Sequence, residues 1–181
     1  MSWDLPYSLT VGGVEYPINY DYRDALDALD VFSAPDLTDL NKIYAMLEII
    51  YGENIPKNRI EAAKQATWFL DGGDVVKSDR ERPKTMDYKQ DAPLLFSAVN
   101  KVAGYEVRNP DIDIHWWTFM GYCNEIDPES SIANIVQIRT KLAKGKKLEK
   151  HEQEYYNENR HLVDFADSGN IEDILDFLRK G

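Results

Sequence analysis

The sequence predicts a mostly α-helical fold, a single helical domain with a short β-hairpin at its N-terminus. Apolar side chains recur every three or four residues along most of the chain, which is the spacing of one helix face. Near the start, two short β-prone runs flank Gly12-Gly13. The length of 181 residues fits one domain, and 43% hydrophobic residues with 12% aromatic residues can supply a packed core.

The hairpin is expected over residues 8–20. Glycine reaches the positive φ angles that tight turns require, so Gly12-Gly13 is the predicted turn. Pro17 lacks a backbone N–H, which favours a second strand at the edge of the sheet.

Three helices are expected in the first half. The first begins at Asp21, and the second follows Pro35 and ends at Gly52. The second has an apolar stripe of Leu37, Leu40, Tyr44, Leu47 and Tyr51. The third runs from about residue 56 to 70, and its expected inward face is Ile60, Ala63, Thr67 and Leu70.

Residues 74–86 have many charges and few apolar side chains, which predicts a mobile loop. It resembles a domain linker, but neither half of the chain has a large core alone. We therefore interpret it as an insertion within one domain spanning residues 1–181.

The second half is expected to hold further helices. Asp87 or Asp91 caps the first, and Pro93 favours the later start or a kink. A short core helix over 114–120 follows a cap at Asp111 or Asp113. Ser130 or Ser131 begins the next helix, which Gly145 breaks. Its expected inward residues are Ile132, Ile135, Val136 and Leu142. A polar, exposed helix over 148–160 and a C-terminal extension helix over 170–181 complete the set.

The net charge of -11 disfavours general nucleic-acid binding, because phosphate contacts need cations. Residues 139–150 hold six bases and one acid, so an acidic partner or an RNA stays an alternative to a solvated helix end. The start has no signal sequence, and the most apolar run, residues 114–123, is about half the length of a membrane helix. We expect a protein of the cytoplasm with no membrane contact.

The sequence predicts no enzyme, catalytic residue, cofactor or metal. His151 opens a zinc-protease-like pattern, but Tyr155 stands where the second histidine is needed. Asp111, Asp113 and His115 alternate, so they do not converge on one side of a helix. Cys123 lies in an apolar run, where a free cysteine usually acts as a small hydrophobic residue.

Trp116 and Trp117 are the most informative pair. Successive helical residues point about 100° apart, so both are buried only in a helix covered on more than one side. The pair therefore indicates either a core helix or one indole at a partner interface, where tryptophan is enriched.

Several short motifs follow one another along the chain. They are Gly12 to Asn19, Asp21-Tyr22-Arg23, Ala62-Ala63, Trp68-Phe69, Asp87 to Ala92, His115-Trp116-Trp117-Thr118-Phe119, Ile138 to Lys141 and Tyr155-Tyr156. In this order they resemble the bacteriophage gene product fifteen family over roughly residues 8 to 165, and the motif at 115–119 is the most specific of them.

The resemblance implies a tail assembly chaperone of long-tailed phages or prophages, acting in the cytoplasm of the bacterial host. Such a protein is thought to coat the long, helical, aggregation-prone tape measure protein while the tail tube polymerises. The implied partners are the tape measure protein, the major tail protein and further copies of the chain. The alternative is a structural virion component of the tail or the head-tail connector. Candidate partner-binding residues are Trp116, Trp117, Ile174 and Leu178.

Self-association through the C-terminal helix is testable. Ile174 and Leu178 lie one turn apart on the apolar stripe expected there. Changing both to Asp should lower the mass measured by light scattering without loss of helical circular dichroism. An oligomer of unchanged mass would refute this role.

Overall fold

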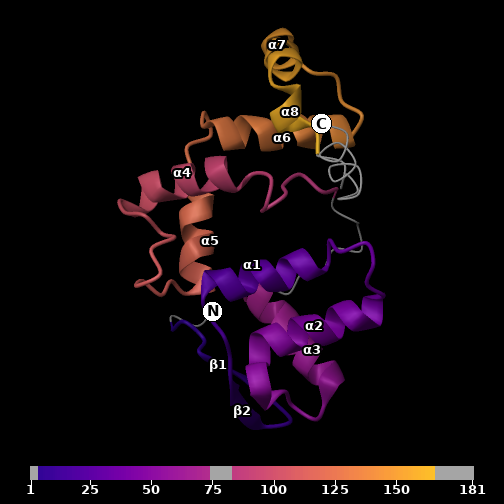
Figure 1. Cartoon of the computed structure of the whole chain (residues 1–181), viewed down its shortest axis with the longest axis vertical. Coiled ribbons are helices and arrows are strands. Elements are labelled where there is room, and N and C mark those ends of the chain that lie inside the picture. Colours follow the sequence, from indigo (N-terminus) through magenta and orange to yellow (C-terminus); the bar gives the residue numbers. More distant parts are fainter. Residues whose placement is uncertain (1–3, 74–82, 166–181) are drawn as a thin grey trace, which may run out of the picture. The chain divides into compact units, whose positions relative to one another are not determined.

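A computed structural model describes residues 4–73 and 83–165. The chain divides into two compact units, residues 1–81 with 99–126 and residues 82–98 with 127–181. The described residues hold eight α-helices and one two-stranded antiparallel sheet, which confirms the mostly α fold with an N-terminal hairpin (Figure 1). That the whole chain is one domain stays a prediction. Most of the loop expected at 74–86, and all of the helix expected at 170–181, lie outside the described residues.

The hairpin forms where the sequence predicts it. Strands β1 (Ser8–Val11) and β2 (Val14–Pro17) pair antiparallel, with Val11 opposite Val14. Gly12 and Gly13 have φ angles of 60° and 78°, so the turn needs two left-handed residues, as a type I′ turn does. β1 contacts α3 (Arg59–Leu70) and buries Leu9 and Val11.

The first unit also contains α1 (Tyr22–Val31), α2 (Asp39–Tyr51), the 3₁₀ turn η1 (Gly52–Asn54) and α5 (Trp116–Asn124). α1 and α2 lie side by side (Figure 1). Each of the first three α-helices begins at a side chain that accepts a backbone N–H. These caps are Asp21, Thr38 and Asn58. Ala25 and Ala28 on α1, and Ala62 and Ala66 on α3, are fully buried, and such small side chains let helices approach closely.

The inward face predicted for α3 is wrong at Ile60 and Thr67, although Leu70 is buried as predicted. Ile60 is 74% exposed and Thr67 is exposed, whereas the face with Ala62, Ala66 and Phe69 is buried. Hydrophobicity alone favoured the bulky Ile60. Close packing against α2 and β1 instead selects the face whose first two turns carry only methyl groups.

His115 caps α5, which corrects the expected cap at Asp111 or Asp113. Its Nδ1 accepts the backbone N–H of Trp117 at 3.1 Å, so Nε2 carries the proton and donates to the carbonyl of Pro6 at 2.9 Å. The backbone of Asp21 also forms a β-bridge with His115. The start of α5 is thereby joined to the segments before both β1 and α1.

Arg23 holds the loop that leads to α5. Its guanidinium donates to the carbonyls of Val107, Asn109 and Ile112, at 2.9–3.3 Å. Asp21 pairs with Arg23 at 3.1 Å and also accepts the backbone N–H of Ile114 at 3.0 Å. The two side chains therefore fix residues 107–114 against the beginning of α1.

The second unit contains α6 (Ser131–Ala143), α7 (Lys150–Glu158) and α8 (Arg160–Val163), together with the first part of α4 (Ala92–Ala103). Ser130 caps α6. The buried hydrophobic cluster of the second unit consists of Ile135, Ile138, Leu148 and Val163. The expected inward position of Leu142 is wrong, since that side chain is exposed and Arg139 lies on the buried face instead. The helix expected over 148–160 corresponds to α7, and Asn159 separates α7 from α8, which extends to Val163.

The cap at His115 should make folding pH-dependent. Burial lowers the pKa of His115 below its ordinary value of 6.5, and the carbonyl of Pro6 opposes this only in part. As the pH falls through about 6.5, the unfolded chain takes up the proton more readily, so the free energy of unfolding should decrease. Urea unfolding between pH 7.5 and 5.5 measures this.

The matched control is His115→Asn, which keeps a cap acceptor but cannot titrate. This variant should be less stable than the wild type at pH 7.5, because the carbonyl of Pro6 loses its donor. It should also show a shallower dependence on pH. Parallel pH profiles for the two proteins would contradict the assignment.

Candidate protein-binding site

Cys123 and His115, which the sequence offered as candidate catalytic residues, have structural roles. The thiol of Cys123 is half-buried, and burial raises its pKa to about 11, so the thiolate is scarce at neutral pH. His115 is occupied as a helix cap. Over residues 4–73 and 83–165, no group of three or more His, Cys, Asp or Glu side chains lies close enough to hold a metal ion.

The two tryptophans join α5 to the end of α3. Trp116 is 4% exposed, and its indole N–H donates to the carbonyl of Leu70 at 2.9 Å. Trp117 is half-buried and donates to the carbonyl of Phe69 at 2.8 Å. The last carbonyls of a helix have no partner within it, so the indoles complete α3.

The close approach of Trp117 explains one glycine. A Cβ atom on Gly73 would lie 2.8 Å from the Cη2 atom of Trp117, and Gly73 also has a φ of 85°. Any other residue there would displace the indole.

Of the predicted partner-binding residues, Trp116 has the burial and hydrogen bond of a core residue. Trp117 keeps some exposed surface, so a partner contact through it stays a prediction. Ile174 and Leu178 lie outside the described residues.

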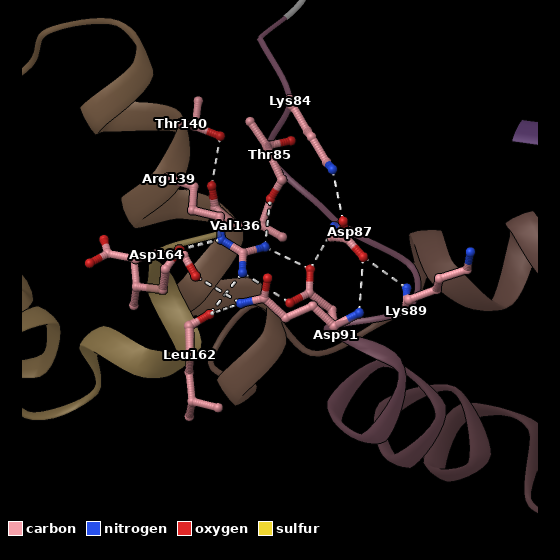
Figure 2. A network of polar contacts seen from close by, with 12 residues as sticks. Lys84, Thr85, Asp87, Lys89, Asp91, Val136, Arg139, Thr140, Leu162 and Asp164 are labelled. Carbon is pink, nitrogen blue, oxygen red and sulfur yellow. Dashed lines mark hydrogen bonds and ion pairs between the residues drawn. The ribbon is translucent and has the colours of Figure 1, made fainter. Parts of the chain in front are cut away.

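A buried ion pair organises the second unit (Figure 2). Arg139 contacts both carboxylate oxygens of Asp91, at 2.6 and 3.0 Å, and the two side chains are 3% and 2% exposed. The same guanidinium donates to the carbonyls of Val163 at 2.6 Å, Leu162 at 2.8 Å and Thr85 at 3.3 Å. One side chain thus joins α8 to the segment before α4, through Thr85 and through Asp91, which directly precedes that helix.

Asp87 and Gln90 extend this network. Asp87 accepts the backbone N–H groups of Lys89 and Gln90 and pairs with Lys84 at 2.7 Å, and these contacts lower its pKa. The amide of Gln90 donates to the carbonyl of Asp164 at 2.8 Å. The motif at 87–92 and the motif at 138–141 therefore meet in space, and both are architectural.

Sequence reasoning missed the buried role of Arg139. The available signal was its spacing, because Arg139 stands one turn after Ile135 and next to Ile138, within an apolar helix face. A charged residue on such a face needs a buried partner of opposite charge, and Asp91 is that partner.

An exposed apolar surface lies at the start of α2. We define the α2 face as Leu37, Leu40, Ile43 and Tyr44. Leu40 and Tyr44 are 60% and 45% exposed. The same stripe continues to Leu47 and Tyr51, which are buried. One continuous apolar stripe is therefore covered in its second half and open in its first.

Acidic side chains surround this surface in the sequence. Residues 24–48 hold six acids and one base. Asp36 and Asp39 are exposed and alternate with Leu37 and Leu40. On the neighbouring helix α1, burial and then the negative charges of Asp21 and Asp27 raise the pKa of Asp24. The region therefore combines exposed apolar area with a negative potential.

The Arg139 network yields a stability prediction. Replacing Arg139 with Met leaves Asp91 buried without its cationic partner and removes the guanidinium that donates to three carbonyls, so the free energy of unfolding should fall by about 3–5 kcal/mol. Arg139→Lys should restore only part of this loss, because an ammonium group cannot reproduce the guanidinium fork. Urea unfolding followed by far-UV circular dichroism is the measurement.

The control is Arg108→Met, which removes an exposed ion pair with Glu106. Solvent screens such a pair, so this variant should unfold close to the wild type. Equal decreases in the free energy of unfolding for the two variants would show that the buried network contributes no more to stability than an exposed ion pair.

A family model described as "Bacteriophage Gp15 protein" matches residues 1–165. No curated protein and no solved structure matches the chain. The match covers most of the chain, including Arg23, His115 and Arg139. It supports a phage structural or morphogenesis protein. The chain belongs to the bacteriophage Gp15 protein family.

Proposed function

We propose that this protein is a tail assembly chaperone that binds the tape measure protein during tail morphogenesis, in the cytoplasm of the bacterial host. The observation that carries the proposal is the α2 face, an exposed apolar surface at the start of a helix in a member of the bacteriophage Gp15 protein family. The motif residues around Arg139 in one unit, and around Arg23 and His115 in the other, bind groups of their own chain and hold the fold together. Function is therefore assigned to a surface and not to a reactive centre.

The physical properties of the chain suit such a role. Exposed apolar helix faces bind amphipathic helices, and the tape measure protein is expected to be long and helical. A net charge of -11 would keep a coated complex soluble through mutual repulsion. Many weak contacts along one filament reinforce each other, because each bound copy raises the local concentration of the next site.

Other partners follow from the same proposal. Copies bound along one tape measure would lie beside each other, so self-association belongs to it, and the major tail protein is a second candidate partner. Nucleic acid and membrane are not expected partners. Among the described residues, no helix has both the length and the apolar character needed to cross a bilayer.

The direct test is co-expression with the tape measure protein encoded by the same phage. The fraction of tape measure protein in the supernatant should rise several-fold over expression alone. An unrelated acidic protein of similar size is the control for a general effect of charge. Tape measure protein that stays in the pellet would contradict the proposal.

Mass spectrometry of purified virions tests the alternative, a structural component of the tail or the head-tail connector. A chaperone should be absent from finished particles or present only in traces. Stoichiometric amounts would replace the chaperone proposal with the structural one.

A further inference from the structure

The helical part of the α2 face is just over one turn long. Leu40 and Tyr44 are about one turn apart, and Ile43 widens the stripe on one side. Leu37 lies just before Thr38, the residue that caps α2. The stripe is continuous with Leu47, Ile50 and Tyr51, which are buried. The core-forming pattern of α2 therefore extends beyond the core, and the exposed part can be covered in the same manner as the buried part.

The backbone of α2 selects the shape of the partner. At the start of α2, Thr38 accepts the backbone N–H groups of Asn41 and Lys42, and beyond the first turn the helix N–H and carbonyl groups bond within the helix. The face therefore offers few backbone hydrogen bonds. An extended peptide on such a surface would bury unpaired backbone groups of its own. A helix satisfies its own backbone and presents side chains at matching intervals.

Charge selects the chemistry of the partner. Asp36 and Asp39 are exposed beside the α2 face, and within residues 24–48 the acids outnumber the single base, Lys42. Lys42 donates to the carbonyl of Phe32 at 3.1 Å, which ties it to the end of α1. A partner with acidic flanks would meet like charges here, whereas basic flanks would be attracted.

We propose that the α2 face binds an amphipathic helix of the partner protein, with an apolar stripe flanked by lysine or arginine. The identification of that partner as the tape measure protein rests on the proposed function. The surface and the chemistry that it requires rest on the exposure of α2 and the acids beside it.

Two synthetic helical peptides of about 18 residues, or about five turns, test the inference with the full-length protein. Both carry leucine at helical spacing, one with lysine and one with glutamate on the flanks. The lysine peptide should bind at least about ten-fold more tightly than the glutamate peptide, as measured by fluorescence anisotropy, and salt should weaken it.

The variant Leu40→Ser with Tyr44→Ser should weaken binding of the lysine peptide about ten-fold or more, because exposed side chains that become buried carry most of such an interface. Ile60→Ser is the matched control, since Ile60 is a more exposed apolar residue on another helix. It should leave the affinity unchanged. All these positions are exposed, and far-UV circular dichroism checks that each variant folds.

A charge variant tests the second half of the inference. Asp36→Lys with Asp39→Lys should reverse the preference between the two peptides without changing the apolar face. Equal binding of the lysine peptide to the wild type and the Leu40/Tyr44 variant would overturn the inference. So would an oligomer that the Leu40/Tyr44 variant abolishes while peptide binding persists, because a second copy would then be the occupant.

Failure of this inference is distinct from failure of the proposed function. A Leu40/Tyr44 variant that still keeps the tape measure protein soluble leaves the chaperone function intact but places it on another surface. A wild-type protein that binds the lysine peptide but leaves the tape measure protein insoluble supports the surface and refutes the chaperone.

Discussion

Carbonyl groups at helix ends and in loops must find donors when they are buried, and this constraint governs both units of the structure. Arg23 donates to three carbonyls between Val107 and Ile112. Arg139 does the same for Thr85, Leu162 and Val163. The indoles of Trp116 and Trp117 complete the end of α3. A fold of short helices joined by long connections has many buried carbonyl groups at helix ends and few strands to pair with them. Arginine and tryptophan side chains supply the missing donors.

This requirement also explains why a charged pair lies inside the second unit. A buried ion pair is not stabilising in itself, because two groups must be desolvated, and apolar residues of similar volume often serve as well. Arg139 meets a further demand, since its fork satisfies carbonyls and the Asp91 carboxylate together. Asp91 in turn accepts the backbone N–H of Asp87 at 2.8 Å. An apolar pair would fill the space but leave these backbone groups without partners.

The sequence predicted those features that depend on local chemistry. The Gly12-Gly13 turn and the caps at Asp21 and Ser130 follow from neighbouring residues alone, and the structure confirms them. Features that depend on distant residues were wrong or missed. The buried face of α3 depends on how closely α2 and β1 approach it. The cap at His115 depends on the carbonyl of Pro6, which lies 109 positions earlier. The candidate site was predicted in part. Periodicity predicted the apolar stripe of α2, but not that Leu40 and Tyr44 would be exposed.

Substitutions in the buried polar networks and substitutions in the exposed apolar surface should affect different properties of this protein. The motif residues bind backbone groups of their own chain, so a change in them acts first on folding. The α2 face, by contrast, has no described partner that covers Leu40 or Tyr44, and a change there need not affect folding. An exposed apolar surface carries a risk of aggregation, which the flanking acids Asp36 and Asp39 counter by repulsion. The same acids restrict which helices can approach, so solubility and selectivity arise from one arrangement of charge around one stripe.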